Sequence, residues 1–227
     1  MNNKTPLNGP CFESSEKPEK LVFLLHGYGD NAVNFFPLAT HLYDPELNIN
    51  FYAPNAPSFI PQYPIGRQWF DLYPNGINFT EAGPTEKEIL KQDCLSSLNL
   101  IKDYINNLCI KHKLTLKDCF IIGFSQGAMM AFEFGKYVNN ALAGCVLLSG
   151  RILPSEDHEK RYFIETPVLI VHGDQDTVLE PKYFEEACEI LKNHDFLFDS
   201  YLMKNEGHTI SPDTLKLTKN FIKKHMT

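Results

Sequence analysis

The fold class is most visible in residues 119–138, which read CFIIGFSQGAMMAFEFGKYV. A short apolar run comes first. Glycines then lie two positions before and two positions after Ser125, and the rest of the stretch is apolar and rich in alanine and methionine. An apolar run bounded by glycine indicates a strand that is buried on both faces, and the longer apolar segment indicates a buried helix. The sequence therefore predicts a strand, a sharp turn at Ser125 and a helix.

The same alternation of strand and helix extends along the rest of the chain, without an internal repeat or a linker. The predicted strands cover residues 21–25, 49–53, 119–123, 143–148, 167–172 and 196–203, and the predicted helices cover 32–43, 85–108, 126–138, 181–191 and 212–224. This order is typical of an α/β fold, in which a mostly parallel central sheet has helices on both faces. We expect one domain over residues 1–227, with a polar and partly ordered N-terminal segment at 1–18.

Several helix starts carry capping residues. Asn31 is expected to cap the first helix, and Ser211 precedes the last one. Thr85, with Glu88 three residues later, fits a capping box at the start of the long helix. Residues 54–84, which precede the long helix, show no steady spacing of apolar residues. Loops of that length are usually functional or disordered. Their aromatic side chains favour an ordered loop: Phe59, Tyr63, Trp69, Phe70, Tyr73 and Phe79.

Composition and charge restrict the class of protein. The chain has 21 basic and 28 acidic residues, a net charge of −7, which disfavours nucleic acid as a partner. Its six cysteines have neither CxxC nor Cys/His metal spacing, so we expect free thiols and no metal site. No apolar run approaches the roughly 18 residues of a membrane span, and the polar first twenty residues show no signal peptide. The sequence thus predicts a cytoplasmic protein without stable membrane insertion.

The motif at the turn is Gly123-Phe124-Ser125-Gln126-Gly127. It matches the G-x-S-x-G pattern of a nucleophile elbow, and it lies in the required context between a strand and a helix. A serine on such a turn has strained backbone angles, and side chains at the flanking glycines would clash with the returning chain. The turn lifts the Ser125 hydroxyl above the sheet, so the sequence predicts Ser125 as a nucleophile.

A serine nucleophile needs a histidine base and an acid that orients it. His208 follows the last predicted strand and is the expected base. The acid should follow strand 167–172, where Asp176 is ranked before Asp174, which is expected to be a turn residue. His26 and His172 are expected to be structural. The other histidines lie in polar segments and are expected at the surface: His41, His112, His158, His194 and His225.

The oxyanion of an acyl-transfer reaction also needs hydrogen-bond donors. The backbone N–H of Gln126, the residue after the nucleophile, is the first expected donor. The second should come from the first glycine loop, where Tyr28 follows His26 and Gly27. Both donors are backbone groups, so the identity of their side chains matters little.

Six segments together resemble the phospholipase/carboxylesterase family of α/β-hydrolases, which includes the acyl-protein thioesterases. They are LLHGYGDN (24–31), RQWFD (67–71), GFSQGAMMA (123–131), LLSGRILP (147–154), HGDQDTVLEP (172–181) and EGHTIS (206–211). The resemblance implies an α/β-hydrolase fold, a triad of Ser125, Asp176 and His208, and an oxyanion hole at Tyr28 and Gln126. It also implies that loop 54–84 lines an acyl channel, with these substrate-binding residues: Trp69, Phe70, Phe59 and Ile65.

The expected activity is that of a serine carboxylesterase or thioesterase that works through an acyl-enzyme and needs no cofactor. The substrate would be a small ester or an acylated molecule with a short to medium acyl chain. A lysophospholipase or an acyltransferase would use the same acyl-serine chemistry, and a non-catalytic binding module is a weaker alternative because all three triad residues are present. The sequence leaves the oligomeric state open between a monomer and a homodimer.

Overall fold

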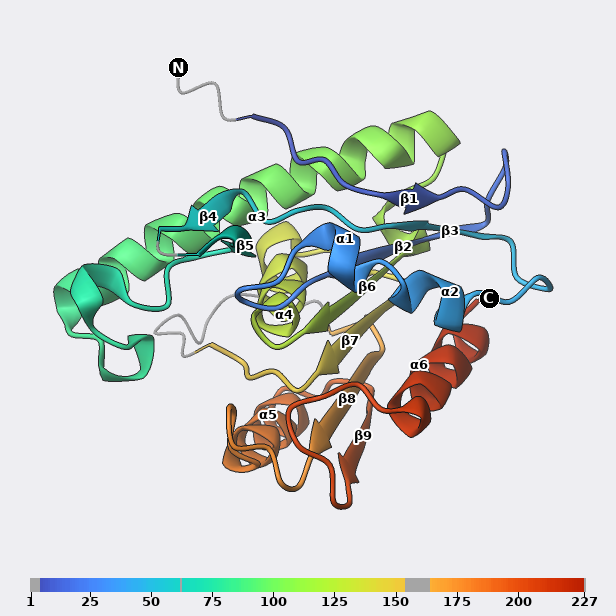
Figure 1. The fold of residues 1–227 in the computed structure, drawn as a ribbon. Coiled ribbons are helices and arrows are strands. Elements are labelled where there is room, and N and C mark those ends of the chain that lie inside the picture. Colours follow the sequence, from blue (N-terminus) through green and yellow to red (C-terminus); the bar gives the residue numbers. More distant parts are fainter. Residues whose placement is uncertain (1–4, 62, 154–163, 227) are drawn as a thin grey trace.

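The computed structural model describes residues 5–61, 63–153 and 164–226. In these residues a central sheet has the strand order β1-β3-β2-β6-β7-β8-β9 (Figure 1). β1 pairs antiparallel with β3, and every other pair in the sheet is parallel. The strands are β1 (Cys11–Phe12), β2 (Lys20–Leu25), β3 (Ile49–Tyr52), β6 (Cys119–Phe124), β7 (Gly144–Leu148), β8 (Val168–Gly173) and β9 (Phe198–Met203).

Helices cover both faces of the sheet, as the alternating pattern predicted. They are α1 (Ala32–Phe35), α2 (Leu38–Leu42), α3 (Pro84–His112), α4 (Gln126–Val138), α5 (Lys182–Asn193) and α6 (Pro212–Lys224). Successive residues of β2 alternate between two cores. Leu21, Phe23 and Leu25 pack with α3, α4 and α5, whereas Val22 and Leu24 pack with α1, α2 and α6. The continuous apolar strands are therefore buried on both sides, and the α/β prediction is confirmed.

Three local predictions differ from the structure. The single helix expected over 32–43 is two short helices, because Pro37 cannot continue α1 and precedes α2. The long helix begins at Pro84 with Gly83 as its N-cap, and no side-chain capping bond forms, so the capping box at Thr85 is wrong. Loop 54–84 contains an antiparallel pair, β4 (Ser58–Ile60) with β5 (Tyr63–Gln68), and two short 3-10 turns, η1 (Pro74–Gly76) and η2 (Phe79–Glu81). The caps at Asn31 and Ser211 form as predicted.

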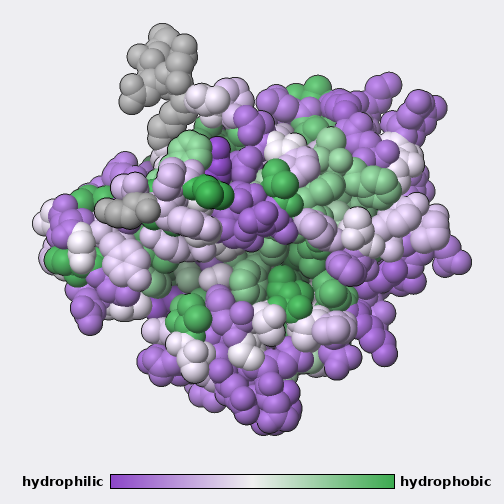
Figure 2. All heavy atoms as spheres, viewed as in Figure 1, coloured by the Kyte–Doolittle hydropathy of each residue, from purple (hydrophilic) through white to green (hydrophobic). Residues whose placement is uncertain are grey.

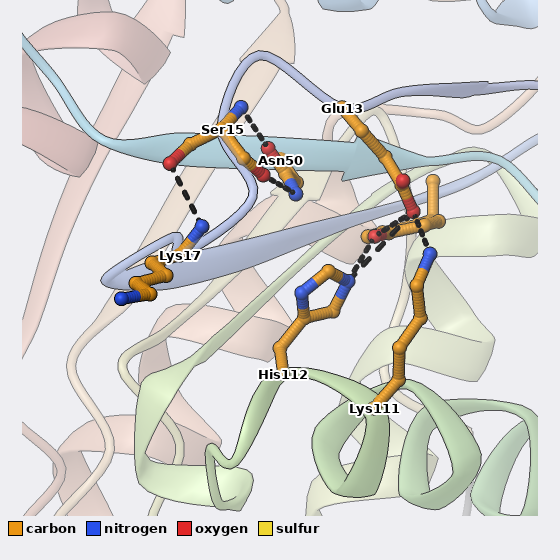
Figure 3. A network of polar contacts seen from close by, with 7 residues as sticks. Glu13, Ser15, Lys17, Asn50, Lys111 and His112 are labelled. Atoms are coloured by element: carbon orange, nitrogen blue, oxygen red, sulfur yellow. Dashed lines mark hydrogen bonds and ion pairs between the residues drawn. The ribbon is translucent and has the colours of Figure 1, made fainter.

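The N-terminal segment is fastened to the sheet and to the end of α3 by a polar network (Figure 3). The Asn50 side chain exchanges two hydrogen bonds with the Ser15 backbone, at 3.1 and 2.9 Å. The Tyr52 hydroxyl donates to the Glu13 carboxylate at 2.7 Å, so His112 Nε2, also 2.7 Å away, must donate to Tyr52. The side chain of His112 is only 4% exposed, which corrects the expectation of a surface histidine. His158 and residues 1–4 lie outside the described part of the chain.

The loops that follow the parallel strands lie together at one end of the sheet. The parallel strands β2, β6, β7, β8 and β9 all end there, and ligands of open α/β sheets bind outside the carboxyl ends of the strands. Figure 2 shows hydrophobic side chains gathered near the middle of the face drawn, with hydrophilic ones around them. Within the described ranges, no helix is both long and apolar enough to cross a bilayer.

Candidate active site

Ser125 lies at the junction of β6 and α4 with a backbone that few residues adopt. Its φ of 54° and ψ of −117° lie outside the regions that non-glycine residues favour. The Ser125 N–H donates to the Leu148 carbonyl oxygen at 2.9 Å, which anchors the turn to the neighbouring strand. Such strain is kept where the surrounding structure enforces it, often at functional sites.

The flanking glycines let the chain pass close to itself at this turn. A Cβ on Gly123 would lie 2.1 Å from the Gly127 oxygen, and one on Gly127 would lie 2.0 Å from the Leu25 oxygen. Both approaches are far inside van der Waals contact with backbone atoms, which cannot move away. The structure therefore gives the expected reason for glycine at both flanks of Ser125.

Asp176, and not Asp174, is the carboxylate that contacts His208. His208 Nδ1 is 2.7 Å from Asp176 Oδ2, and the Asp176 side chain is completely buried. Asp174 instead accepts from the Asn205 N–H at 2.7 Å and pairs with Lys204 at 3.2 Å, so it braces the turn that leads to His208. This geometry agrees with the order in which the sequence ranked the two acids.

The bond to Asp176 also fixes the proton on His208. An ionised carboxylate only accepts hydrogen bonds, so His208 Nδ1 carries the proton and Nε2 of the neutral ring is bare. The other oxygen, Asp176 Oδ1, accepts from the backbone N–H groups of Val178 and Leu179, both at 2.9 Å. The Phe124 ring lies against His208 with ring centroids 4.8 Å apart. His208 is therefore held in the tautomer that a general base needs.

Ser125 and His208 line the same cavity of about 310 Å³. Its apolar walls come from Leu72, Tyr73, Phe79, Phe124, Met129, Val178 and Leu179, and its polar groups include Tyr28, Asp30 and Asn78. This volume lies at the small end of the roughly 300–1,000 Å³ that is usual for small-molecule sites. In the described part of the chain, no cluster of three or more His, Cys, Asp or Glu side chains could hold a metal ion.

Tyr28 and Gln126, the two expected oxyanion donors, both line this cavity. Gln126 is the first residue of α4, where backbone N–H groups have no acceptor within the helix and favour negative charge. The loop of Tyr28 lies against the turn, since a Cβ on Gly27 would be 3.4 Å from the Ser125 Cβ. The structure thus brings both backbone segments close to Ser125.

Trp69 and Phe70 have a different place from the one expected of substrate-binding residues. Both are buried, at 1% and 2% exposed, and neither lines the cavity. The Trp69 indole N–H donates to the His26 carbonyl oxygen at 2.9 Å, while its backbone N–H donates to Gln126 Oε1 at 2.9 Å. Gln126 Nε2 in turn donates to the Phe70 carbonyl oxygen at 2.8 Å. These hydrogen bonds hold loop 54–84 against the first glycine loop and the start of α4.

Phe59 and Ile65 are also outside the cavity. They lie on the β4–β5 hairpin and are 54% and 67% exposed, with the Arg67 guanidinium 4.1 Å from the centre of the Phe59 ring. Tyr73 and Phe79 are among the aromatic residues of the expected loop, whereas Met129 is a lining residue that the sequence does not single out. Met129 follows Ser125 by four residues, one helical turn along α4, and that spacing could have indicated it.

His26 is a structural residue, as the sequence predicted. The Ala56 N–H donates to its Nε2 at 3.0 Å, so Nδ1 carries the proton and donates to the Gly27 carbonyl oxygen at 2.8 Å. Burial lowers the pKa of the ring, which keeps it neutral. His26 therefore holds the first glycine loop against residue 56.

The two buried imidazoles predict a loss of stability in acid. Burial is the largest cause of a lowered pKa in both His26 and His172, whose ordinary value is 6.5. The unfolded chain then binds protons that the folded protein does not, so the free energy of unfolding falls as the pH drops below about 6.5. We expect Tm to decrease from about pH 7 to about pH 5 in a calorimetric series. The decrease should be smaller in His26→Gln and unchanged in the exposed control His41→Gln; an equal decrease in all three proteins would contradict this account.

The fold, together with a serine on the sharp turn between β6 and α4, defines the class of protein as an α/β-hydrolase. Within that class, the model of the family described as Phospholipase/Carboxylesterase matches residues 10–226. The chain therefore belongs to the phospholipase/carboxylesterase family, and it is a serine hydrolase.

Relatives with curated names agree with this family. The chain is 28% identical over 240 aligned residues to "Acyl-protein thioesterase 1" of Candida albicans, with 97% of each chain covered. It is 26% identical over 209 residues to "Acyl-protein thioesterase 1 homolog 1" of Dictyostelium discoideum, with 89% of each covered.

A solved structure is similar over almost the whole chain. The crystal structure of esterase PE8 has a TM-score of 0.84 and 29% identity, and the match covers 97% of this chain and 99% of that one. Arabidopsis thaliana SOBER1 shares the fold at a TM-score of 0.77 and 23% identity, with 92% and 99% covered. The relatives agree with the family that the model shows, and the two solved structures share the fold.

Proposed function

We propose that this protein hydrolyses carboxylic esters or thioesters through an acyl-enzyme formed on Ser125. His208 is the general base, Asp176 orients it, and the backbone N–H groups of Tyr28 and Gln126 hold the oxyanion. The observation that carries the proposal is the 2.7 Å bond from His208 Nδ1 to Asp176 Oδ2, beside a cavity that both Ser125 and His208 line. The names of the relatives, carboxylesterases and acyl-protein thioesterases, support the same reaction class.

The reaction would proceed in two steps. His208 Nε2 takes the Ser125 hydroxyl proton as the oxygen attacks the acyl carbonyl carbon, and the resulting imidazolium is stabilised by Asp176. The same proton passes to the leaving alcohol or thiol, and an acyl-serine remains. A water then gives a proton to His208 and attacks the acyl-serine, which releases the acid and restores the Ser125 hydroxyl.

The cavity limits the acyl group that this site would take. Seven apolar side chains contribute to its walls, but its volume of about 310 Å³ is small for a long chain. For p-nitrophenyl esters from acetate to palmitate, we expect kcat/KM to peak at a short to medium chain and to fall by at least about tenfold at palmitate. An optimum at palmitate would contradict this view of the cavity, and a protein that hydrolyses no ester or thioester would contradict the proposed function itself.

A matched pair of variants tests which residues form the walls of the acyl-binding cavity. Met129→Ala enlarges the cavity from α4 and should move the optimum towards longer chains. Ile65→Ala removes an exposed side chain of the hairpin and should leave the optimum unchanged. If Ile65→Ala shifted the optimum and Met129→Ala did not, the hairpin would be the acyl-binding element.

A further inference from the structure

The carboxylate of Asp176 is in contact with two imidazole rings. Its Oδ2 is 2.7 Å from His208 Nδ1 and 3.3 Å from His172 Nε2. His208 lines the cavity, whereas His172 is 1% exposed at the end of β8 and does not line the cavity. The proposed mechanism gives His172 no role, although it shares an oxygen with His208.

The hydrogen bonds of His172 fix its proton and hold the turn that carries Asp176. Nε2 is 2.7 Å from the Leu179 carbonyl oxygen, which only accepts, so Nε2 carries the proton. The proton is donated to Leu179, and Asp176 Oδ2 lies 3.3 Å from the same nitrogen, close enough for the carboxylate charge to act on the ring. The Leu179 N–H donates to Asp176 Oδ1 at 2.9 Å. His172 therefore ties together both ends of the turn formed by residues 176–179.

His172 is also built to stay neutral. Its Nδ1 is buried and has no hydrogen-bond partner in the described residues, and burial lowers the pKa of the ring. The charged or titratable groups that act on it are Asp176 and His208, and α5 presents the apolar ring of Phe184, 6.3 Å between centroids. Among the described residues no acceptor beside Nδ1 would compensate a second proton, so the His172 ring stays neutral.

We propose that His172 is a positioning residue: a neutral donor that closes the Asp176 turn through its bond to Leu179 and places its N–H dipole beside Oδ2, so that the carboxylate is held in one orientation towards His208. The inference rests on the proposed function, because it assigns His172 a part in that site. It extends the site inward from the cavity by one buried side chain that acts through Asp176 and not on the substrate.

Two substitutions separate this role from simple packing. In His172→Gln the amide nitrogen can lie near the position of Nε2 and donate without titrating, whereas His172→Phe fills the ring volume and cannot donate. We expect His172→Phe to lower kcat by about tenfold to a hundredfold with little change in KM, since small misplacements near a reacting group have effects of this size. His172→Gln should keep most of the wild-type kcat.

The pH profile provides a readout that packing alone would not change. Without the His172 N–H dipole 3.3 Å from Oδ2, Asp176 should attract the His208 imidazolium more strongly, so the acidic limb of kcat/KM should move to higher pH in His172→Phe. The limb should stay in place in His172→Gln. Wild-type kcat and profile in His172→Phe would overturn the proposal, and so would equal losses in the two folded variants.

An NMR titration of the His208 ring tests the same proposal without any substrate. We expect the pKa of His208 to rise in His172→Phe relative to the wild type and to be unchanged in His172→Gln. If the protein hydrolysed no ester, this shift would still support the positioning role while the proposed function failed; no shift would overturn the role. Should His172→Phe not fold, as judged by Tm, His172→Asn takes its place, because its shorter amide does not reach the position of Nε2.

Discussion

Ser125→Ala is expected to lower kcat for p-nitrophenyl butyrate hydrolysis by about 10⁴-fold to 10⁶-fold, the range seen when a serine hydrolase loses its nucleophile. The hydroxyl of Ser125 supplies the atom that forms the acyl-enzyme, and alanine leaves nothing that could take its place. The residual rate would come from the oxyanion donors and from binding alone. Steady-state kinetics on the purified variant, with Tm measured in parallel, provide the test.

A serine outside the site gives the matched control. Ser58 is exposed on β4 and does not line the cavity, so Ser58→Ala should keep the wild-type kcat. Equal Tm values in wild type and Ser125→Ala would show that the loss of activity is chemical. If a well-folded Ser125→Ala retained more than about a tenth of the wild-type kcat, Ser125 would not be the nucleophile.

Asp176→Asn is expected to lower kcat by about 10⁴-fold, the effect known for the equivalent change in a Ser-His-Asp enzyme. The asparagine amide can donate to His208 Nδ1, which would then be bare, and the proton would move to Nε2. A ring with its proton on Nε2 cannot take the proton of Ser125. The acid is therefore required for the correct tautomer of His208 as well as for its orientation.

The neighbouring acid provides a close control for Asp176. Asp174 lies two residues away and bonds to the Asn205 N–H and to Lys204, not to His208. Asp174→Asn should therefore change kcat by no more than a few-fold, with any effect appearing mainly in Tm. A larger loss of kcat in Asp174→Asn than in Asp176→Asn would reverse the assignment of the two acids.

The elements that the sequence predicted best are those for which local pattern and burial agree. The helix predicted over 126–138 is α4 without a change of boundary, and strand 119–123 differs from β6 by one residue. The G-x-S-x-G motif also predicted a contact, since both glycines are required by backbone atoms around Ser125. Such positions are predictable because the chain itself, over a few residues, determines them.

The residues whose place in the structure differs from the expected one depend on distant parts of the chain. An aromatic residue in a loop can line a cavity or brace it, and for Trp69 the outcome depends on partners 43 and 57 residues away, at His26 and Gln126. His112 looked like a surface residue because its helix is polar there, yet Tyr52 of β3 covers it. No short pattern around either residue contains this information.

The most direct test of the acyl-enzyme mechanism is the mass of the protein after reaction with a fluorophosphonate, followed by peptide mapping. The predicted result is one adduct per chain, on the peptide that contains Ser125, with loss of ester hydrolysis in proportion to labelling and no adduct in Ser125→Ala. An adduct at another residue, or unlabelled protein that still hydrolyses esters at the wild-type rate, would contradict it.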